Sequence, residues 1–229
     1  MVMTLPVREI VAATPRAQIV RLDLGGRDFP YLAGQAVLLD IPGQASRRAY
    51  SLTAAPSDAS CDGCLEVLVG VDLTGRSIPL APGTHVDVDG PIGRFTFPID
   101  PSERRFIFIA GGTGIAPLRA MLRQALAMPH RDIHVLYSAR TPDEFAYQQE
   151  LRFLARDGKI ELRQTITRDD GSANWTGGRG RIGRAELQPL VHDPATLCFV
   201  CGPPAFVKDT KRLLNDVGMA ADRIKVEEW

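Results

Sequence analysis

The chain has 229 residues, enough for one large domain or two of roughly 100 residues each. Its 45% hydrophobic residues are typical of a globular protein, and its 27 basic residues balance 27 acidic ones. This balance gives no overall field that would favour nucleic acid or a membrane surface. No apolar run approaches the roughly 18 residues of a membrane-spanning helix, and no basic-then-apolar leader begins the sequence. We therefore expect a soluble, cytoplasmic protein that binds no nucleic acid and has no membrane span.

Short strands separated by turns are predicted over the first hundred residues. Apolar or alternating runs lie at 5–12, 17–24, 36–41, 49–53, 65–71 and 85–88. Glycine, proline and polar turn residues separate these runs, among them Pro56-Ser57-Asp58. Six strands at this spacing predict an antiparallel six-stranded β-barrel over residues 1–100. No long helix is expected before about residue 115.

The pattern changes at residues 98–103, where we place a domain boundary. Residues 106–110 form a continuous apolar run, as in a strand buried on both faces of a parallel sheet. Further strand-like runs lie at 133–137, 160–166, 197–200 and 224–226, and helical spacing lies at 118–126, before 157 and at 205–215. Strands that alternate with helices predict an α/β domain with a parallel sheet over residues 101–229.

Four cysteines fall into two pairs, Cys61 with Cys64 and Cys198 with Cys201. A zinc ribbon separates its pairs by about 15–20 residues, far fewer than the stretch between Cys64 and Cys198. The same spacing excludes a local iron–sulfur cluster. Cys198 and Cys201 lie in a strand-like run, where alternation places them on opposite faces. We predict no bound metal, and Cys61 and Cys64 are either a redox pair in a loop or ordinary thiols.

The segment Arg48-Ala49-Tyr50-Ser51 combines a cation, an aromatic ring and a hydroxyl within one strand. Alternation places Arg48 and Tyr50 on the same face. The guanidinium could then bind a pyrophosphate while the ring lies against a planar group, with Ser51 at the edge of that group. A flavin nucleotide offers a ring system and a phosphate at about this separation. A half-buried strand with one exposed arginine is the alternative.

A glycine-rich turn, Gly111-Gly112-Thr113-Gly114-Ile115-Ala116-Pro117, directly follows the first buried strand of the second half. Glycines let the backbone approach a ligand closely, and N–H groups at the start of a helix attract phosphate. Pro117 suits a first helical turn, but it stands where the dinucleotide fingerprint has its third glycine. The turn also lacks the Lys-Ser/Thr ending of a phosphate-binding ATPase loop. A nucleotide site and a purely structural turn both fit this segment.

Two later strands end in hydroxyl and cationic residues. The first ends in Tyr137-Ser138-Ala139-Arg140 and the second in Thr167-Arg168-Asp169, whereas a NAD-selective site carries an acid about 20 residues after its glycines. Both arginines could meet the extra 2′-phosphate of NADP, although solvated arginines at strand ends are common.

Two further features lie near the carboxyl terminus. Cys201-Gly202-Pro203 closes a buried strand, so its thiol is expected at the sheet edge where open α/β sheets bind ligands. The last residues are Glu227-Glu228-Trp229, and a terminal ring directly after a strand is expected to pack on something.

Together these elements resemble the ferredoxin–NADP reductase superfamily of flavoenzymes. The matching elements occur in the family's order over nearly the whole chain: residues 48–51, Gly90-Pro91-Ile92-Gly93-Arg94-Phe95, residues 111–117, residues 201–203 and the terminal aromatic residue. The resemblance implies an FAD-binding barrel and an NADP-binding α/β domain. Leu52-Thr53 also occurs in FMN-binding relatives, but residues 90–95 are typical of FAD members, and we expect FAD.

The resemblance also implies the roles of individual residues. Expected flavin contacts come from Arg48, Ala49, Tyr50, Ser51, Leu52, Thr53 and the loosely matching turn Gly75, Arg76 and Ser77. Expected nicotinamide-nucleotide contacts come from Gly112, Thr113, Gly114, Pro117, Ser138, Arg140, Thr167, Arg168, Cys201, Gly202 and Pro203. Trp229 would cover one flavin face until nicotinamide displaces it. The expected catalytic residues are Ser51 near flavin N5, Cys201 near nicotinamide C4, and Glu227 in support of hydride transfer.

The implied activity is hydride transfer from NADPH, favoured over NADH, to FAD. Electrons would pass to a separate acceptor: a ferredoxin, an oxygenase, a haem protein or a small oxidant. The alternative is a non-catalytic flavin-binding subunit that relays electrons inside a larger complex. Relatives of that kind usually carry a cysteine-rich cluster tail, which this sequence lacks.

Overall fold

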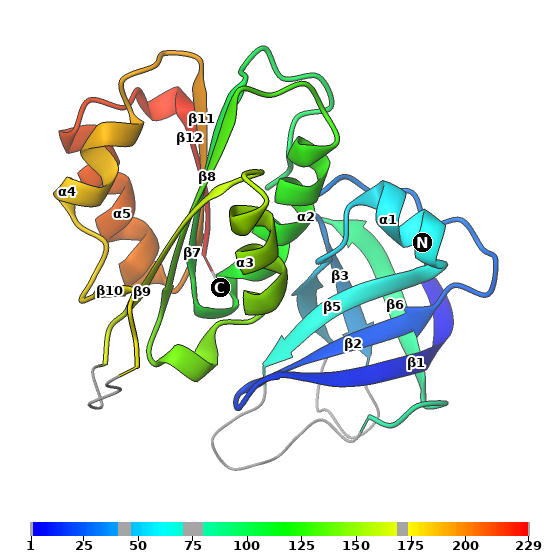
Figure 1. Ribbon diagram of the computed structural model, residues 1–229. Coiled ribbons are helices and arrows are strands. Elements are labelled where there is room, and N and C mark those ends of the chain that lie inside the picture. The colour runs from blue at the N-terminus through cyan, green and yellow to red at the C-terminus, as the bar shows by residue number, and fades with distance from the viewer. Residues whose placement is uncertain (1, 41–46, 71–79, 169–173, 229) are drawn as a thin grey trace. The chain divides into compact units, whose positions relative to one another are not determined.

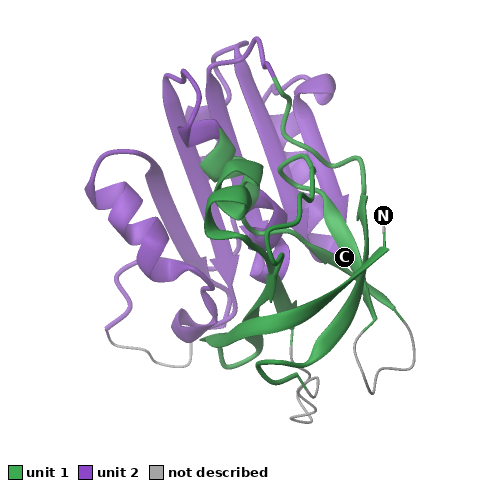
Figure 2. Ribbon diagram, turned by 90° about the vertical axis from the view of Figure 1, so that its right-hand side faces the viewer, with its two compact units in different colours: residues 1–99, 119–124 green, residues 100–118, 125–229 purple. Residues whose placement is uncertain are grey.

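The computed structural model describes residues 2–40, 47–70, 80–168 and 174–228. The chain divides into two compact units (Figure 2). Unit 1 comprises residues 1–99 together with 119–124, and unit 2 comprises residues 100–118 and 125–229. The sequence pattern did not indicate that a helical segment as late as 119–124 belongs with the first unit.

Unit 1 is built on a six-stranded antiparallel sheet, as the sequence predicted (Figure 1). The strands are β1 (Val2–Thr14), β2 (Ala17–Asp23), β3 (Ala36–Asp40), β4 (Arg48–Ser51), β5 (Cys64–Gly70) and β6 (His85–Ile92). They run in the order β4-β3-β6-β1-β2-β5. An antiparallel bridge between Leu52, which directly follows β4, and Val67 of β5 joins the two edge strands. This seam closes the sheet into a barrel.

Alternating residues of the six strands fill the interior of unit 1. Leu5, Leu22, Val37 and Val67 are each almost completely buried in one hydrophobic cluster. Burying one such side chain contributes about 1.5–3 kcal/mol, so the period-two pattern fixes which face of each strand turns inward.

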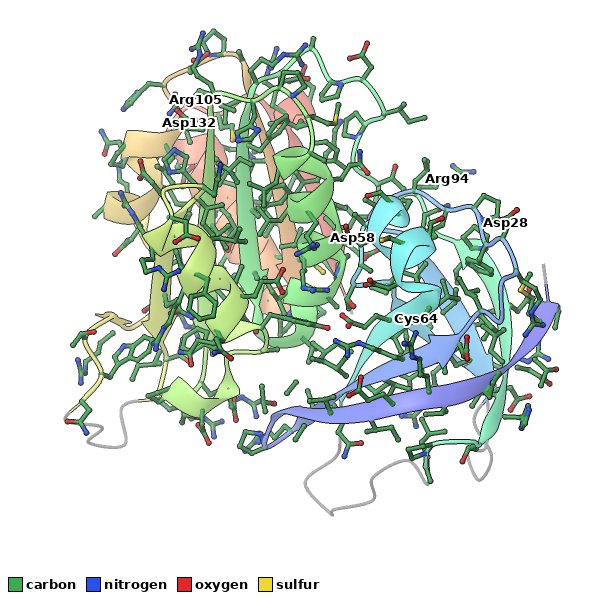
Figure 3. All side chains as sticks on the ribbon, turned by 45° about the vertical axis from the view of Figure 1, so that its right-hand side comes forward. Asp28, Asp58, Cys64, Arg94, Arg105 and Asp132 are labelled. Carbon is green, nitrogen blue, oxygen red and sulfur yellow. The ribbon has the colours of Figure 1, made fainter. Side chains whose placement is uncertain are left out.

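One predicted turn is a helix. Pro56-Ser57-Asp58 begins helix α1 (Pro56–Asp62), where a proline at the first position costs no hydrogen bond. The helix ends at Gly63, whose left-handed conformation (φ 64°) suits glycine. Cys64 is buried at the start of β5 (Figure 3), whereas Cys61 is exposed on helix α1, so the two thiols do not share a loop.

Unit 2 contains a six-stranded parallel sheet, again as predicted (Figure 1). Its strands are β7 (Arg105–Gly111), β8 (Asp132–Ala139), β9 (Glu161–Ile166), β10 (Gly178–Arg179), β11 (Thr196–Gly202) and β12 (Ile224–Glu228). Its helices are α3 (Gln148–Arg156), α4 (Arg184–Leu187) and α5 (Pro204–Asp216), together with both ends of α2 (Ile115–Leu126), whose residues 119–124 belong to unit 1. The two-residue strand β10 and the one-turn helix α4 were not predicted, because elements so short carry no periodic pattern.

Both faces of the parallel sheet are covered. Ile107 and Cys198 pack in one cluster with Val207 and Leu214 of α5. On the opposite face Phe108 and Phe199 are almost completely buried, and their rings stack with centroids 5.5 Å apart. At the amino ends of β7 and β8, Arg105 and Asp132 form an ion pair of 2.7 Å (Figure 3).

The strand order places a switch point at the centre of unit 2. The sheet runs β10-β9-β8-β7-β11-β12, so the chain builds outward from β7 in one direction and then continues from β11 in the other. In open α/β sheets, ligands bind beyond the carboxyl ends of the strands at such a point.

Within the described ranges, no helix is long and apolar enough to cross a membrane. The same residues contain no group of three His, Cys, Asp or Glu side chains arranged to hold a metal ion.

Candidate functional site

Two turns meet at the switch point of the parallel sheet. One is the 3-10 turn Gly112–Gly114 that follows β7, and the other is formed by Gly202 and Pro203 at the end of β11. A β-carbon on Gly114 would lie 2.2 Å from the carbonyl oxygen of Cys201, and one on Gly202 would lie 2.8 Å from the Phe206 ring. Glycine at position 114 is therefore required for these two turns to touch, and glycine at position 202 leaves room for the Phe206 ring, in addition to any role in ligand binding.

The glycine-rich turn leads into helix α2. Gly112 has a positive φ of 56°, and the Ile115 N–H donates to the carbonyl oxygens of Gly112 and Thr113. Pro117 is buried in the first turn of the helix, as predicted. The amino end of a helix carries partial positive charge, so a backbone without β-carbons at this point can approach an anionic phosphate.

Cys201 and Glu227 come together at the carboxyl edge of the sheet. They are paired in register on the parallel strands β11 and β12. The thiol is only 1% exposed, and burial together with the nearby Glu227 raises the pKa of Cys201, so the thiol is neutral at physiological pH. Glu227 is half-buried, and burial raises its pKa to about 7. This edge therefore carries a carboxyl group that can take up or release a proton near neutral pH.

The two candidate 2′-phosphate arginines are neighbours. Hydrogen bonds continue beyond the ends of β8 and β9: the Thr167 N–H donates to Ala139 O at 2.9 Å, and the Arg168 N–H donates to Arg140 O at 2.8 Å. Arg140 and Arg168 are both exposed, whereas Ser138 is buried. The structure thus brings two cations onto one edge, where an anion could meet both.

In unit 1 the strand register agrees with the alternation expected for β4. Tyr50 pairs with Val37 and Arg48 pairs with Leu39, so Arg48 and Tyr50 occupy one face of the strand. Tyr50 packs against the barrel core, and Arg48 is exposed. Ser51, at the end of the strand, is half-buried.

Leu52 and Thr53 are placed differently from the residues before them. Both are completely buried, with Leu52 in the barrel core. The Thr53 hydroxyl donates to a carboxylate oxygen of Glu66 at 2.7 Å. The side chains of both residues are thus engaged inside the barrel. Gly75, Arg76, Ser77 and Trp229 lie outside the described residues.

Sequence reasoning missed two charged residues that contact this segment. Glu66 lies in β5, and Arg119 of helix α2 reaches both Glu66 and the Thr53 carbonyl oxygen. A signal was present, because Glu66 is a single acid inside the otherwise apolar strand Cys64–Gly70. A charge at such a position requires a buried partner.

Comparison with known proteins agrees with this architecture. Residues 108–212 match the family model described as an oxidoreductase NAD-binding domain. The chain is 34% identical to ferredoxin–NADP reductase B of Sorangium cellulosum. The alignment of 241 residues covers 96% of each protein. It is 28% identical to oxidoreductase NAD-binding domain-containing protein 1 of Danio rerio, over 96% of this chain and 89% of that protein.

Solved structures give the same picture. The ferredoxin reductase in carbazole 1,9a-dioxygenase matches with a TM-score of 0.83 and 25% identity, over 100% of this chain and 69% of its own. The Amycolatopsis cytochrome P450 reductase GcoB matches with a TM-score of 0.86 and 26% identity, over 99% of this chain and 70% of its own.

A closed antiparallel barrel joined to a parallel sheet with a glycine turn at its switch point defines a two-domain nucleotide-dependent reductase. The chain belongs to the ferredoxin–NADP reductase superfamily, as its motifs predicted. It is an NAD(P)H-dependent flavin oxidoreductase with FAD and a nicotinamide nucleotide as cofactors.

The residues present fit both cofactors. At the switch point, Gly112 and Gly114 leave the backbone free of β-carbons beside the start of a helix, which suits a phosphate. On β4, an exposed guanidinium and a half-buried ring share one face of the strand, which suits a pyrophosphate joined to a planar ring.

Proposed function

We propose that this protein is a reductase that prefers NADPH to NADH, holds FAD, and passes electrons to a separate acceptor. The adjacency of Arg140 and Arg168 carries the nucleotide preference, because two cations at one sheet edge favour the additional phosphate of NADPH. When bound, the nicotinamide and flavin rings supply the hydride and electron transfer chemistry. The chain binds and orients these rings and supplies the groups that hold or move protons.

On the flavin side, the proposal assigns three tasks to β4. Arg48 forms charge-assisted hydrogen bonds with the flavin pyrophosphate, and the Tyr50 ring lies against the isoalloxazine. Ser51 offers its hydroxyl at the ring edge near N5. The turn Gly75, Arg76 and Ser77 is proposed to hold flavin phosphate, and Trp229 to cover the other face of the flavin ring.

On the nicotinamide side, residues at the switch point of the parallel sheet bind the nucleotide. The backbone N–H groups at Gly112, Thr113 and Gly114 hold phosphate, and Arg140, with Arg168 and Thr167, reads the 2′-phosphate. Cys201 packs beside the nicotinamide as a neutral thiol. Glu227 is the group at this edge that exchanges a proton near neutral pH.

The acceptor is proposed from the relatives' names. They include a ferredoxin reductase of a dioxygenase, a cytochrome P450 reductase and a glycine betaine monooxygenase reductase subunit. These names favour a ferredoxin, an oxygenase or a haem protein as the acceptor, with a small oxidant as the remaining candidate.

The test is anaerobic reduction of the FAD-loaded protein. We expect NADPH to bleach the flavin absorbance faster than NADH at equal subsaturating concentrations, by about tenfold or more, which corresponds to roughly 1.4 kcal/mol. Equal rates would contradict the NADPH preference. A protein that remains colourless after incubation with FAD would contradict the flavin assignment.

A further inference from the structure

Thr53, Glu66 and Arg119 form a buried polar cluster two residues beyond Ser51. We propose that this cluster is a positioning device that fixes the Ser51 hydroxyl for the flavin reaction. The inference rests on the proposed function, since it assumes that Ser51 faces the flavin.

The cluster holds Thr53 through all of its polar groups. Its N–H donates to Glu66 O at 2.9 Å, and its hydroxyl donates to Glu66 Oε1 at 2.7 Å. Its carbonyl oxygen accepts a hydrogen bond from Arg119 Nη1 at 2.9 Å. The same Arg119 nitrogen lies 2.8 Å from Glu66 Oε1, which closes a ring of contacts. Thr53 therefore has little freedom to shift along or across the barrel seam.

The residues on either side of Thr53 are held as well. The Leu52 N–H donates to Gln35 O at 2.9 Å, and Ala54 O accepts from the Tyr31 hydroxyl at 2.8 Å. Three consecutive residues are thus anchored at the closing seam, directly after a strand whose own residues are exposed or half-buried. Because consecutive α-carbons are only about 3.8 Å apart, an anchor at Leu52 and Thr53 leaves Ser51 a small range of positions.

Stability alone does not explain a charged cluster at this place. The side chains of Glu66 and Arg119 are 6% and 12% exposed, and removing such a pair from water costs several kcal/mol per ion. Burial by itself would raise the pKa of Glu66, but the charge of Arg119 and the hydrogen bonds from Thr53 and Arg21 lower it, so the carboxylate stays ionised. Apolar residues of similar volume often stabilise a core equally well. What the charged cluster adds is a directional hold on Thr53.

The Glu66 carboxylate also forms an ion pair with Arg21, which does not include Thr53. Arg21 Nε lies 2.8 Å from Glu66 Oε2, and Arg21 Nη1 lies 2.5 Å from Glu9 on the exposed side of the barrel. Among the described residues, Arg21 forms hydrogen bonds with Glu66 and Glu9 and none with Thr53. Arg21 therefore supplies a matched control, because its loss perturbs Glu66 without removing a contact to Thr53.

The experiment compares Thr53→Val, which keeps the shape and removes the hydroxyl, with Thr53→Ser, which keeps the hydroxyl. Each FAD-loaded protein is mixed anaerobically with NADPH at a series of concentrations. Two quantities are measured: the limiting rate of flavin reduction, and the NADPH concentration that gives half of this rate. We expect Thr53→Val to lower the limiting rate about tenfold, with that concentration changed less than twofold, because misplacement of a group at the reaction centre affects rate more than binding. Thr53→Ser and Arg21→Met should stay within about threefold of the wild type.

Two more variants keep the test decisive if Thr53→Val folds poorly. Arg119→Lys keeps the positive charge on a shorter side chain, which withdraws the donor from Thr53 O and Glu66 Oε1, and it should also lower the limiting rate. In a Ser51→Ala background, Thr53→Val should have little further effect, because the two changes act through one hydroxyl. If the variants lower the melting temperature but leave the limiting rates unchanged, the role of the cluster is purely structural and the inference is overturned. A wild-type protein that NADPH does not reduce would overturn the proposed function as well, so the two failures are distinguishable.

Discussion

Cys201 and Glu227 occupy paired positions on the adjacent strands β11 and β12, at the carboxyl edge of the parallel sheet. Burial raises the pKa of both groups, and the Glu227 charge adds to the effect on Cys201. The thiol is therefore held neutral, while the carboxyl group titrates near pH 7. The Glu227 carboxyl, which exchanges a proton, and the neutral Cys201 thiol thus lie together at the proposed nicotinamide site.

The raised pKa of Glu227 predicts how stability depends on pH. Its carboxyl titrates near 4.5 in the unfolded chain and near 7 in the folded protein. Between these values the folded protein keeps a proton that the unfolded chain has released, so the free energy of unfolding falls as pH rises. This contribution is intact below about pH 4.5 and lost by about pH 7. Glu227→Gln should remove this part of the pH dependence, as urea unfolding across that range would show.

The exposed neighbour Glu228 provides the control for this prediction. Glu228→Gln should leave the slope of unfolding free energy against pH close to that of the wild type. If Glu227→Gln and Glu228→Gln have the same effect on the slope, the titration of Glu227 is not the cause.

Gly114 is expected to tolerate no side chain. In Gly114→Ala the new β-carbon would meet the Cys201 carbonyl oxygen, so the turn or the end of β11 must move. We predict a loss of about 1–3 kcal/mol in unfolding free energy, together with weaker NADPH binding. Denaturant unfolding and a nucleotide titration measure the two effects separately.

Gly70→Ala is the matched substitution for Gly114→Ala. A β-carbon on Gly70 would have its nearest neighbour at 3.9 Å, an ordinary contact. This variant should keep wild-type nucleotide binding. An unaltered melting curve for Gly114→Ala would contradict the close contact between the two turns.

Arg48 and its neighbour Arg47 should differ in their effect on FAD. Arg47 forms ion pairs with Asp40 at 3.4 Å and Asp89 at 3.6 Å, whereas Arg48 is the proposed pyrophosphate ligand. We predict that Arg48→Met weakens FAD binding by about 10- to 100-fold, the value of one or two charge-assisted hydrogen bonds. Arg47→Met should change FAD affinity by less than about threefold, because exposed ion pairs contribute little. Fluorescence titration of the apoprotein with FAD compares them directly, and equal losses would remove the special role of Arg48.

The sequence predicted the features that follow from periodic patterns. Apolar and alternating runs predicted the strands that contain Leu5, Leu22 and Val37, which are buried inside the barrel, and the continuous apolar run around Phe108 marked a strand buried on both faces. It also put Arg48 and Tyr50 on one face of β4, in agreement with the register. Each of these inferences needed only residues close together in the chain.

Features that depend on distant partners could not be predicted in this way. Pro56-Ser57-Asp58 reads equally as a turn or as the start of a helix, and only the packed chain decides that α1 forms. The contact of Arg119 with Thr53 joins residues far apart in sequence, so no local pattern reveals it. For Gly114 the sequence fitted both a phosphate contact and a structural turn, and only the structure shows that its closest constraint is the Cys201 carbonyl oxygen.

The central claim is that this flavin reductase prefers NADPH because of the neighbouring cations Arg140 and Arg168. Its most direct test is the ratio of flavin reduction efficiencies with NADPH and NADH, measured anaerobically for the wild type and for the double variant Arg140→Ala/Arg168→Ala. Arg152→Ala, which removes an exposed cation from α3, serves as the control. We predict that the double variant loses efficiency with NADPH by about 10- to 100-fold, keeps it with NADH, and lowers the ratio toward one. An unchanged ratio in the double variant, or a wild type that uses NADH as well as NADPH, would contradict the claim.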